Sequence, residues 1–171
     1  MSLETARDLF LHELSDTVSA EHIVEKMLVT LQGETKNADV KAALKHHHTE
    51  TLQQIKNLDK VFKQLGEKPE ETTCHAAEGL KEEHDSLQEE KPSQLVLEVG
   101  NLAGAAKTEH YEIASYTALI QMAKDLGEPE VAALLKENLD QEKEMAKTIE
   151  SLSKQVGKEV RAEEKELAVA N

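Results

Sequence analysis

Cysteine, aromatic residues, glycine and proline are all scarce in this sequence of 171 residues. It contains one cysteine, three prolines, seven glycines, two phenylalanines, two tyrosines and no tryptophan. A single cysteine excludes an intramolecular disulfide framework and is typical of a reducing compartment. So few glycines and prolines leave little material for the turns of an all-β fold. These absences favour a helical protein.

Long apolar runs and an excess of positive charge are also missing. No segment approaches the ~18 apolar residues of a membrane-spanning helix, and the first ten residues lack the apolar core of a signal peptide. There are 34 acidic residues against 20 basic ones, which gives a net charge of −14. This charge disfavours contact with nucleic acids and anionic membranes. We therefore expect a soluble, acidic, cytoplasmic protein that binds no nucleic acid and no membrane.

Capping residues, glycines and prolines divide the chain into four long helices and one short helix. The helices are expected at about residues 5–31, 37–65, 72–90, 93–126 and 129–156. Short loops join the first two and the last two, so each of these pairs is antiparallel. Residues 66–92 are long enough to return along the bundle while carrying the short helix. The sequence thus predicts an all-α four-helix bundle at 1–157 with one long crossover, and a charged, frayed or disordered tail at 158–171.

Each long helix carries a carboxylate on or beside its apolar stripe and close to its midpoint. The midpoints fall near residues 18, 51, 110 and 142. The inward-facing residues are Glu21 on the first helix, His47 and Glu50 on the second, Glu109 and Glu112 on the fourth, and Glu142 on the fifth. Because the middles of antiparallel helices meet at one level, we expect these side chains to converge in the core.

Converging buried carboxylates need a compensating charge. Burying each one unpaired costs several kcal/mol, and the apolar stripes contain no lysine or arginine. Protonation could neutralise one or two of them. Five carboxylates and one imidazole also match the ligands of a dinuclear centre, in which two divalent ions supply four positive charges, and the oxygen-rich donor set suits iron or manganese. The sequence therefore predicts a two-ion site.

Three further residues have both a functional and an ordinary interpretation. His110 lies beside Glu109 and could be a ligand, a ligand's partner or a packing residue. Tyr116 follows Glu112 by one turn and could donate a hydrogen bond to a carboxylate, donate an electron, or simply be buried with a satisfied hydroxyl. Cys74, at the start of the short helix, is interpreted as an unreactive capping thiol because no second cysteine or placed base accompanies it.

Several sequence blocks resemble those of the YciF/YciE-like proteins, bacterial stress-associated members of the ferritin-like superfamily. The blocks comprise residues 14–21, 47–51, 74–80 and 109–116, and residues 134–143 fit the last block. The resemblance spans about residues 5–153. It implies a ferritin-like bundle that forms a dimer in the bacterial cytoplasm, and it implies no settled enzymatic activity.

The chain departs from the wider di-iron pattern at two helices. The usual second-helix motif is Glu-x-x-His, whereas this chain has His47-x-x-Glu50, with Gln53 where the histidine would fall. Glu142 is followed by methionine, not histidine, three residues later. The remaining pair, Glu109-x-x-Glu112, resembles the carboxylate pair of rubrerythrin-type sites.

Two functional hypotheses follow from these residues and this resemblance. In the first, the bundle holds a dinuclear carboxylate-bridged centre of iron or manganese, which oxidises Fe(II) or detoxifies peroxide during stress, with oxygen or peroxide as the reaction partner. In the second, the chain is a non-enzymatic, stress-induced dimeric interaction module without a functional metal, and its inward carboxylates are protonated or hydrated.

Overall fold

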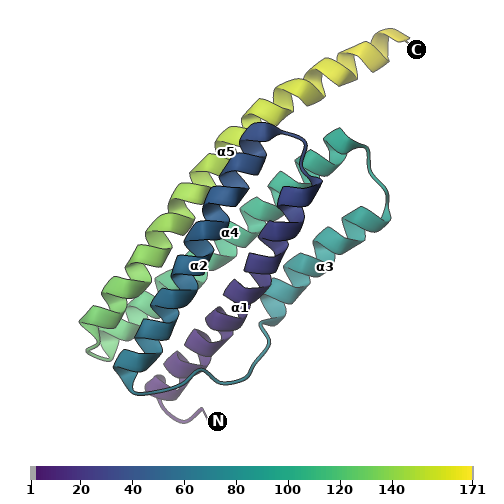
Figure 1. Ribbon diagram of the computed structural model, residues 1–171. Helices are drawn as coiled ribbons and strands as arrows, with labels where there is room; N and C mark the ends of the chain where they lie inside the picture. Colours follow the sequence, from purple (N-terminus) through teal and green to yellow (C-terminus); the bar gives the residue numbers. More distant parts are fainter. Residues whose placement is uncertain (1–2, 171) are drawn as a thin grey trace.

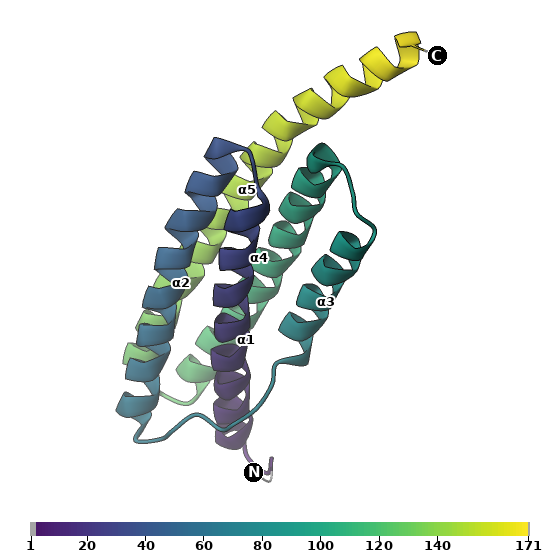
Figure 2. The ribbon, with the colours of Figure 1, turned by 45° about the vertical axis from the view of Figure 1, so that its right-hand side comes forward.

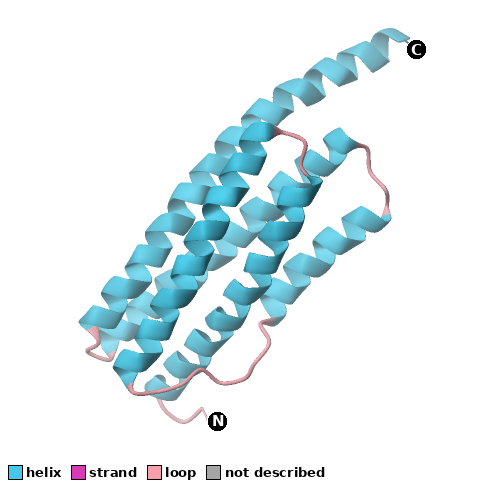
Figure 3. Cartoon of the chain, viewed as in Figure 1, coloured by secondary structure: helices cyan, strands magenta, loops and turns pink. Residues whose placement is uncertain are grey.

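The computed structural model describes residues 3–170 as five helices joined by loops (Figures 1 and 3). The helices are α1 (Ala6–Glu34), α2 (Ala38–Leu65), α3 (His75–Glu89), α4 (Gln94–Asp125) and α5 (Pro129–Ala170). No strand occurs in this part of the chain. None of the helices over the described range combines the length and apolarity needed to cross a membrane. The predicted all-α fold is confirmed.

Helices α1, α2, α4 and α5 form a four-helix bundle, and α3 lies outside it. Within the bundle α1 packs along α2 and α4 packs along α5, each pair antiparallel (Figure 1). Of the described helices, α3 contacts α1 and α4 alone, and the turned view in Figure 2 shows it set apart from α2 and α5. Residues 66–93 are therefore the long crossover with its short helix that the loop lengths predict.

Local signals in the sequence determine most helix ends. Thr5 and Asp8 form a capping box at the start of α1, in which each side chain accepts a hydrogen bond from the other residue's backbone N–H. The Asn37 side chain accepts hydrogen bonds from the first backbone amides of α2. Gly66 ends α2 in the left-handed conformation, with φ of 71°. These boundaries agree with the predictions to within one or two residues.

Three boundaries differ from the predictions. The first helix is expected to end near Leu31, but α1 continues through Gly33 to Glu34. Helix α3 begins at His75, after Thr72 and Thr73, because Cys74 is its N-cap and the Cys74 Sγ accepts a hydrogen bond from a backbone amide at 3.4 Å. Helix α5 does not end at Gly157 but continues to Ala170, past the rest of the bundle (Figure 1). One glycine costs a helix only about 1 kcal/mol, and strong helix formers predominate after it. The expected frayed tail is therefore helical up to residue 170.

The core consists of two apolar clusters separated by a polar layer. One cluster includes Phe10, Leu14, Leu58, Leu119 and Leu135, and the other includes Leu28, Val40, Leu102, Ile149 and Val156. Between them, each long helix buries polar side chains, among them Glu21, His47, Thr51, Gln54, Glu109, Glu112, Asn138 and Glu142. The polar layer lies at mid-helix on α1, α2 and α4, as the stripes predict. On α5 it lies in the N-terminal half, because that helix continues past its predicted end to Ala170.

Candidate metal centre

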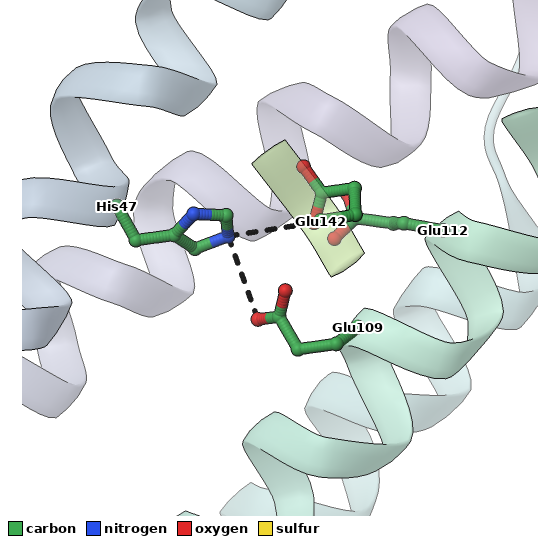
Figure 4. Close-up of side chains that lie close together, drawn as sticks. All are labelled: His47, Glu109, Glu112 and Glu142. Carbon is green, nitrogen blue, oxygen red and sulfur yellow. Dashed lines mark ion pairs between the residues drawn. The ribbon is translucent and has the colours of Figure 1, made fainter. Parts of the chain in front are cut away.

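Four buried side chains in the polar layer point their donor atoms at one another. His47 comes from α2, Glu109 and Glu112 from successive turns of α4, and Glu142 from α5 (Figure 4). Each of the four residues offers one ligand atom, and these four atoms all lie within 4.8 Å of one another. All four are buried, so the group is shielded from solvent by the bundle.

The His47 ring is held between the carboxylates on its two sides. Its Nε2 lies 3.4 Å from Glu109 Oε1 and 3.6 Å from Glu142 Oε2 (Figure 4). Its Nδ1 lies 3.3 Å from Glu50 Oε2. A proton on Nδ1 would be donated to Glu50 and would leave the Nε2 lone pair facing the centre. This is the arrangement by which an outer carboxylate orients a histidine ligand.

Most side-chain oxygen and nitrogen atoms that face the interior at this layer have no hydrogen-bond partner. They are Glu21 Oε2, His47 Nε2, Glu109 Oε2, both carboxylate oxygens of Glu112, and Glu142 Oε2. Over residues 3–170, the ion pairs of Glu109 and Glu142 are with His47, and none of these four glutamates pairs with a lysine or arginine. Buried acceptors left in this state are costly. A set of acceptors without donors fits a bound cation.

Burial raises the pKa of three of the carboxyl groups well above their usual range. Desolvation is the largest cause for Glu21, Glu109 and Glu112, and the nearby Glu142 carboxylate is the second. At Glu21, a hydrogen bond from Tyr116 lowers the pKa and so offsets part of this rise. Protons and metal ions would therefore compete for the same oxygens.

The six predicted ligands do not all lie in one group. His47, Glu109, Glu112 and Glu142 come together as expected. Glu21 of α1 is fully buried, but it lies outside that group and accepts a hydrogen bond from the Tyr116 hydroxyl through Oε1. Glu50 is partly exposed and contacts the rings of His47 and His46. The role of these two glutamates as metal ligands stays a prediction.

The three residues with open interpretations are now placed. His110 is exposed on α4 and lies outside the group of four. Tyr116 is fully buried and donates its hydrogen bond to Glu21, one of the predicted possibilities. The Cys74 thiol is buried, lies 3.0 Å from the Tyr111 hydroxyl and caps α3. Burial raises the pKa of this thiol, which agrees with its interpretation as an unreactive cap.

Sequence reasoning missed Gln54 as part of the site. The apolar stripe of α2 favours the neighbouring Ile55 as the inward residue, yet Gln54 is fully buried and its Nε2 donates a hydrogen bond to Glu142 Oε1. The signal was available, because Gln54 continues the 4-3 spacing of His47 and Thr51 along one helix face. Gln54 was missed because a polar glutamine is not expected on a buried helix face.

Comparisons with known proteins agree with this architecture. The model of a domain of unknown function, DUF892, matches residues 5–162. The chain is 40% identical over 144 residues to Protein YciF of Escherichia coli strain K12, covering 84% of this chain and 87% of that protein. The resemblance noted from the sequence blocks is therefore confirmed.

Solved structures show the same fold. The crystal structure of the E. coli stress protein YciF matches with a TM-score of 0.88 and 36% identity, covering 91% of this chain and 99% of that one. YcfI from Rhodopseudomonas palustris, described as a candidate structural protein, matches with a TM-score of 0.85 and 38% identity over 87% and 95% of the two chains. A protein from Xanthomonas campestris shares the fold at a TM-score of 0.76 and 22% identity, covering 94% of this chain and 99% of that one.

Proposed function

This chain belongs to the DUF892 family, and we propose that it binds a dinuclear centre of iron or manganese in the polar layer of its bundle. The observation that carries the proposal is the group of His47, Glu109, Glu112 and Glu142, whose ligand atoms lie within 4.8 Å of one another. Several of these atoms have no hydrogen-bond partner. Opposite ligands of an octahedral ion are about 4.2 Å apart, so the donor spacing suits a metal ion.

Glu21 and Glu50 would complete the site for a second ion. The Glu21 Oε2 atom is buried without a hydrogen-bond partner, and the Glu50 carboxylate is near enough to the group of four to raise the pKa of Glu109. Together with the group of four, they supply five carboxylates and one imidazole. Two divalent ions would offset four of the five negative charges, and this oxygen-rich set suits iron or manganese.

The protein would hold and shield the ions. The two apolar clusters close the polar layer from either end of the bundle. Glu50 would orient His47, and Gln54 and Tyr116 each occupy one oxygen of a predicted ligand. When bound, such a metal pair supplies redox chemistry of the kind used for Fe(II) oxidation or peroxide detoxification. Similarity to an E. coli stress protein supports a role in stress.

A second candidate function is a non-enzymatic dimeric interaction module. The observation that favours it is apolar exposure at the start of α4. Val96 and Val99 have exposed fractions of 53% and 42%. In this alternative, the homodimer carries the function and the inward carboxylates are protonated. Alanine at Glu21 or Glu142 would then leave the dimer and its function intact, which size-exclusion chromatography would show.

Metal analysis tests the proposed function. Protein stripped with a chelator is incubated with Mn²⁺, or with Fe²⁺ without oxygen, then desalted and analysed. We expect about two ions per chain. Glu112→Gln is expected to lower this occupancy, because both of its oxygens lack hydrogen-bond partners. The exposed Glu144→Gln on α5 is the matched control and should bind like the wild type. Binding of less than about one-tenth of an ion per chain would contradict the proposal.

A further inference from the structure

A series of hydrogen bonds runs from the surface to Glu21, one of the predicted ligands, and touches all four bundle helices. On α2, Lys60 Nζ donates to Asn57 Oδ1 at 3.0 Å. Asn57 Nδ2 donates to Asn138 Oδ1 on α5 at 2.9 Å. Asn138 Nδ2 donates to the Tyr116 hydroxyl oxygen on α4 at 3.0 Å, and that hydroxyl donates to Glu21 Oε1 on α1.

The direction of this series is determined by its outer end. A lysine ammonium group donates hydrogen bonds and cannot accept them, so the amide oxygen of Asn57 must face Lys60. Gln53 Nε2 donates to the same oxygen at 3.1 Å. The Asn57 amide nitrogen therefore faces Asn138 and requires the Asn138 oxygen as its acceptor. The Asn138 nitrogen then faces Tyr116, and the single phenolic proton of Tyr116 is left for Glu21.

Asn138 also connects to the second carboxylate of the site. Besides donating to Tyr116, its Nδ2 donates to the backbone oxygen of Gln54 at 3.3 Å. The Gln54 side chain in turn donates to Glu142 Oε1. Asn138 is fully buried, and its hydrogen-bonding atoms are satisfied by these partners.

Glu21 and Glu142 are consequently held in the same way. One oxygen of each, Oε1, accepts a hydrogen bond from a neighbouring side chain. The other oxygen, Oε2, is buried with no hydrogen-bond partner. Each carboxylate thus keeps one buried oxygen free of hydrogen bonds, although a free carboxylate has two oxygens to offer a metal.

We propose that Asn138 is a positioning residue for the metal centre, which directs the Tyr116 proton to Glu21 and so restricts Glu21 to binding metal through Oε2 alone. This inference rests on the proposed function. Removal of Asn138 frees the Tyr116 hydroxyl to turn away from Glu21, which leaves the carboxylate without a fixed orientation. Loss of partners that orient ligands typically weakens metal binding 10- to 100-fold.

The test compares Mn²⁺ affinity between the wild type and Asn138→Leu, with free Mn²⁺ measured by electron paramagnetic resonance. Leucine has a similar size and makes no hydrogen bonds. The expected result is an affinity about tenfold lower. Asn101→Leu is the matched control, because Asn101 is a buried asparagine of α4 that donates to Glu34 at 3.0 Å, away from the group of four. The control should lose stability but keep wild-type affinity.

A double-mutant cycle separates positioning from a merely structural role. Tyr116→Phe is expected to weaken Mn²⁺ binding, and adding Asn138→Leu should weaken it little further because the series is already broken. Asn57→Leu interrupts the series one link nearer the surface and serves as the second variant if Asn138→Leu does not fold. It should lower the affinity in the same direction.

Wild-type affinity in Asn138→Leu or Asn57→Leu would overturn the positioning role while leaving the proposed metal centre intact. The positioning role would also be overturned if Asn138→Leu weakened Mn²⁺ binding as much in the Tyr116→Phe variant as in the wild type. Failure of the wild-type protein to bind Mn²⁺ would overturn the proposed function, and the positioning role with it.

Discussion

Glu142 has the strongest electrostatic influence within the polar layer. Its buried carboxylate raises the pKa of Glu21, Glu109 and Glu112. Glutamine at this position would keep an oxygen to accept the hydrogen bond from Gln54 while removing the charge. We therefore predict that Glu142→Gln makes the metal-free protein more stable, by on the order of 1 kcal/mol or more.

The same substitution should remove most of the stabilisation by metal. Thermal unfolding followed by circular dichroism, with and without Mn²⁺, measures both effects. The wild-type melting temperature is expected to rise with added metal, and that of Glu142→Gln to rise much less. A metal-free variant less stable than the wild type, or an undiminished response to Mn²⁺, would contradict this description of Glu142.

Cys74 provides a second prediction at the residue scale. Its thiol is buried, and burial raises its pKa, so little thiolate is present at neutral pH. Native protein is expected to react with a thiol reagent such as dithionitrobenzoate at least about 100-fold more slowly than protein unfolded in urea. Similar rates in the two states would show that the Cys74 thiol is accessible and activated.

Single residues also show how far the sequence could predict the site. Glutamates on apolar stripes are conspicuous, so the group of Glu109, Glu112 and Glu142 could be found from helical spacing alone. Gln54 could not be found by apolarity, because the neighbouring Ile55 is the better core residue. The separate position of Glu21, outside the group of four, depends on the Tyr116 contact and hence on tertiary packing.

At the scale of elements, glycines have opposite effects at different places. Gly66 adopts φ of 71° at the end of α2, a conformation that strains any residue with a Cβ. Gly104 lies inside α4, and a Cβ there would meet no atom within 4 Å. We predict that Gly66→Ala lowers the free energy of unfolding by about 1 kcal/mol, whereas Gly104→Ala raises it by about 0.5–1 kcal/mol.

Chemical denaturation of the two variants beside the wild type measures these changes. Because both replace glycine with alanine, the difference isolates the backbone conformation at each position. Stabilisation by Gly66→Ala would show that α2 does not end in the left-handed conformation.

The helix ends show what local signals determine and what they leave open. Caps such as Thr5 and Asn37 are strong and correctly predict the starts of α1 and α2. Gly157 is a weaker signal, because glycine ends a helix only when the following residues favour another conformation. Here they favour helix, and α5 continues to Ala170.

At the scale of the whole molecule, the raised pKa values predict how stability depends on pH. In the folded metal-free protein, Glu21, Glu109 and Glu112 hold protons more tightly than in the unfolded chain, where glutamate has a pKa of about 4.3. The folded state therefore binds more protons above that pH. The contribution of these groups to stability is complete below about pH 4.3 and is lost as the pH rises through their folded pKa values.

Urea denaturation of metal-free protein between pH 5 and pH 8 measures this dependence. Glu112→Gln has one such group fewer and should lose less stability over the same range, while its surface charge is almost the same. Added Mn²⁺ should reverse the trend, because metal binding requires deprotonated carboxylates. An identical pH dependence in Glu112→Gln and the wild type would contradict the assignment of these protons to the polar layer.

The net charge of −14 has two parts in the folded molecule. Most acidic side chains are on the surface, where charge keeps proteins apart. A smaller set lies between two apolar clusters, where only protons or cations can offset it. The number of glutamates is visible in the sequence, but this division depends on how four helices meet.

Anomalous diffraction from crystals containing Mn²⁺ tests whether the polar layer holds metal, because it locates the ions without relying on affinity or activity. We predict two anomalous peaks in the polar layer, one of them about 2.0–2.3 Å from His47 Nε2 and from oxygens of Glu109, Glu112 and Glu142. Manganese found only at surface carboxylates, with the four side chains unliganded and in contact with one another, would contradict the account.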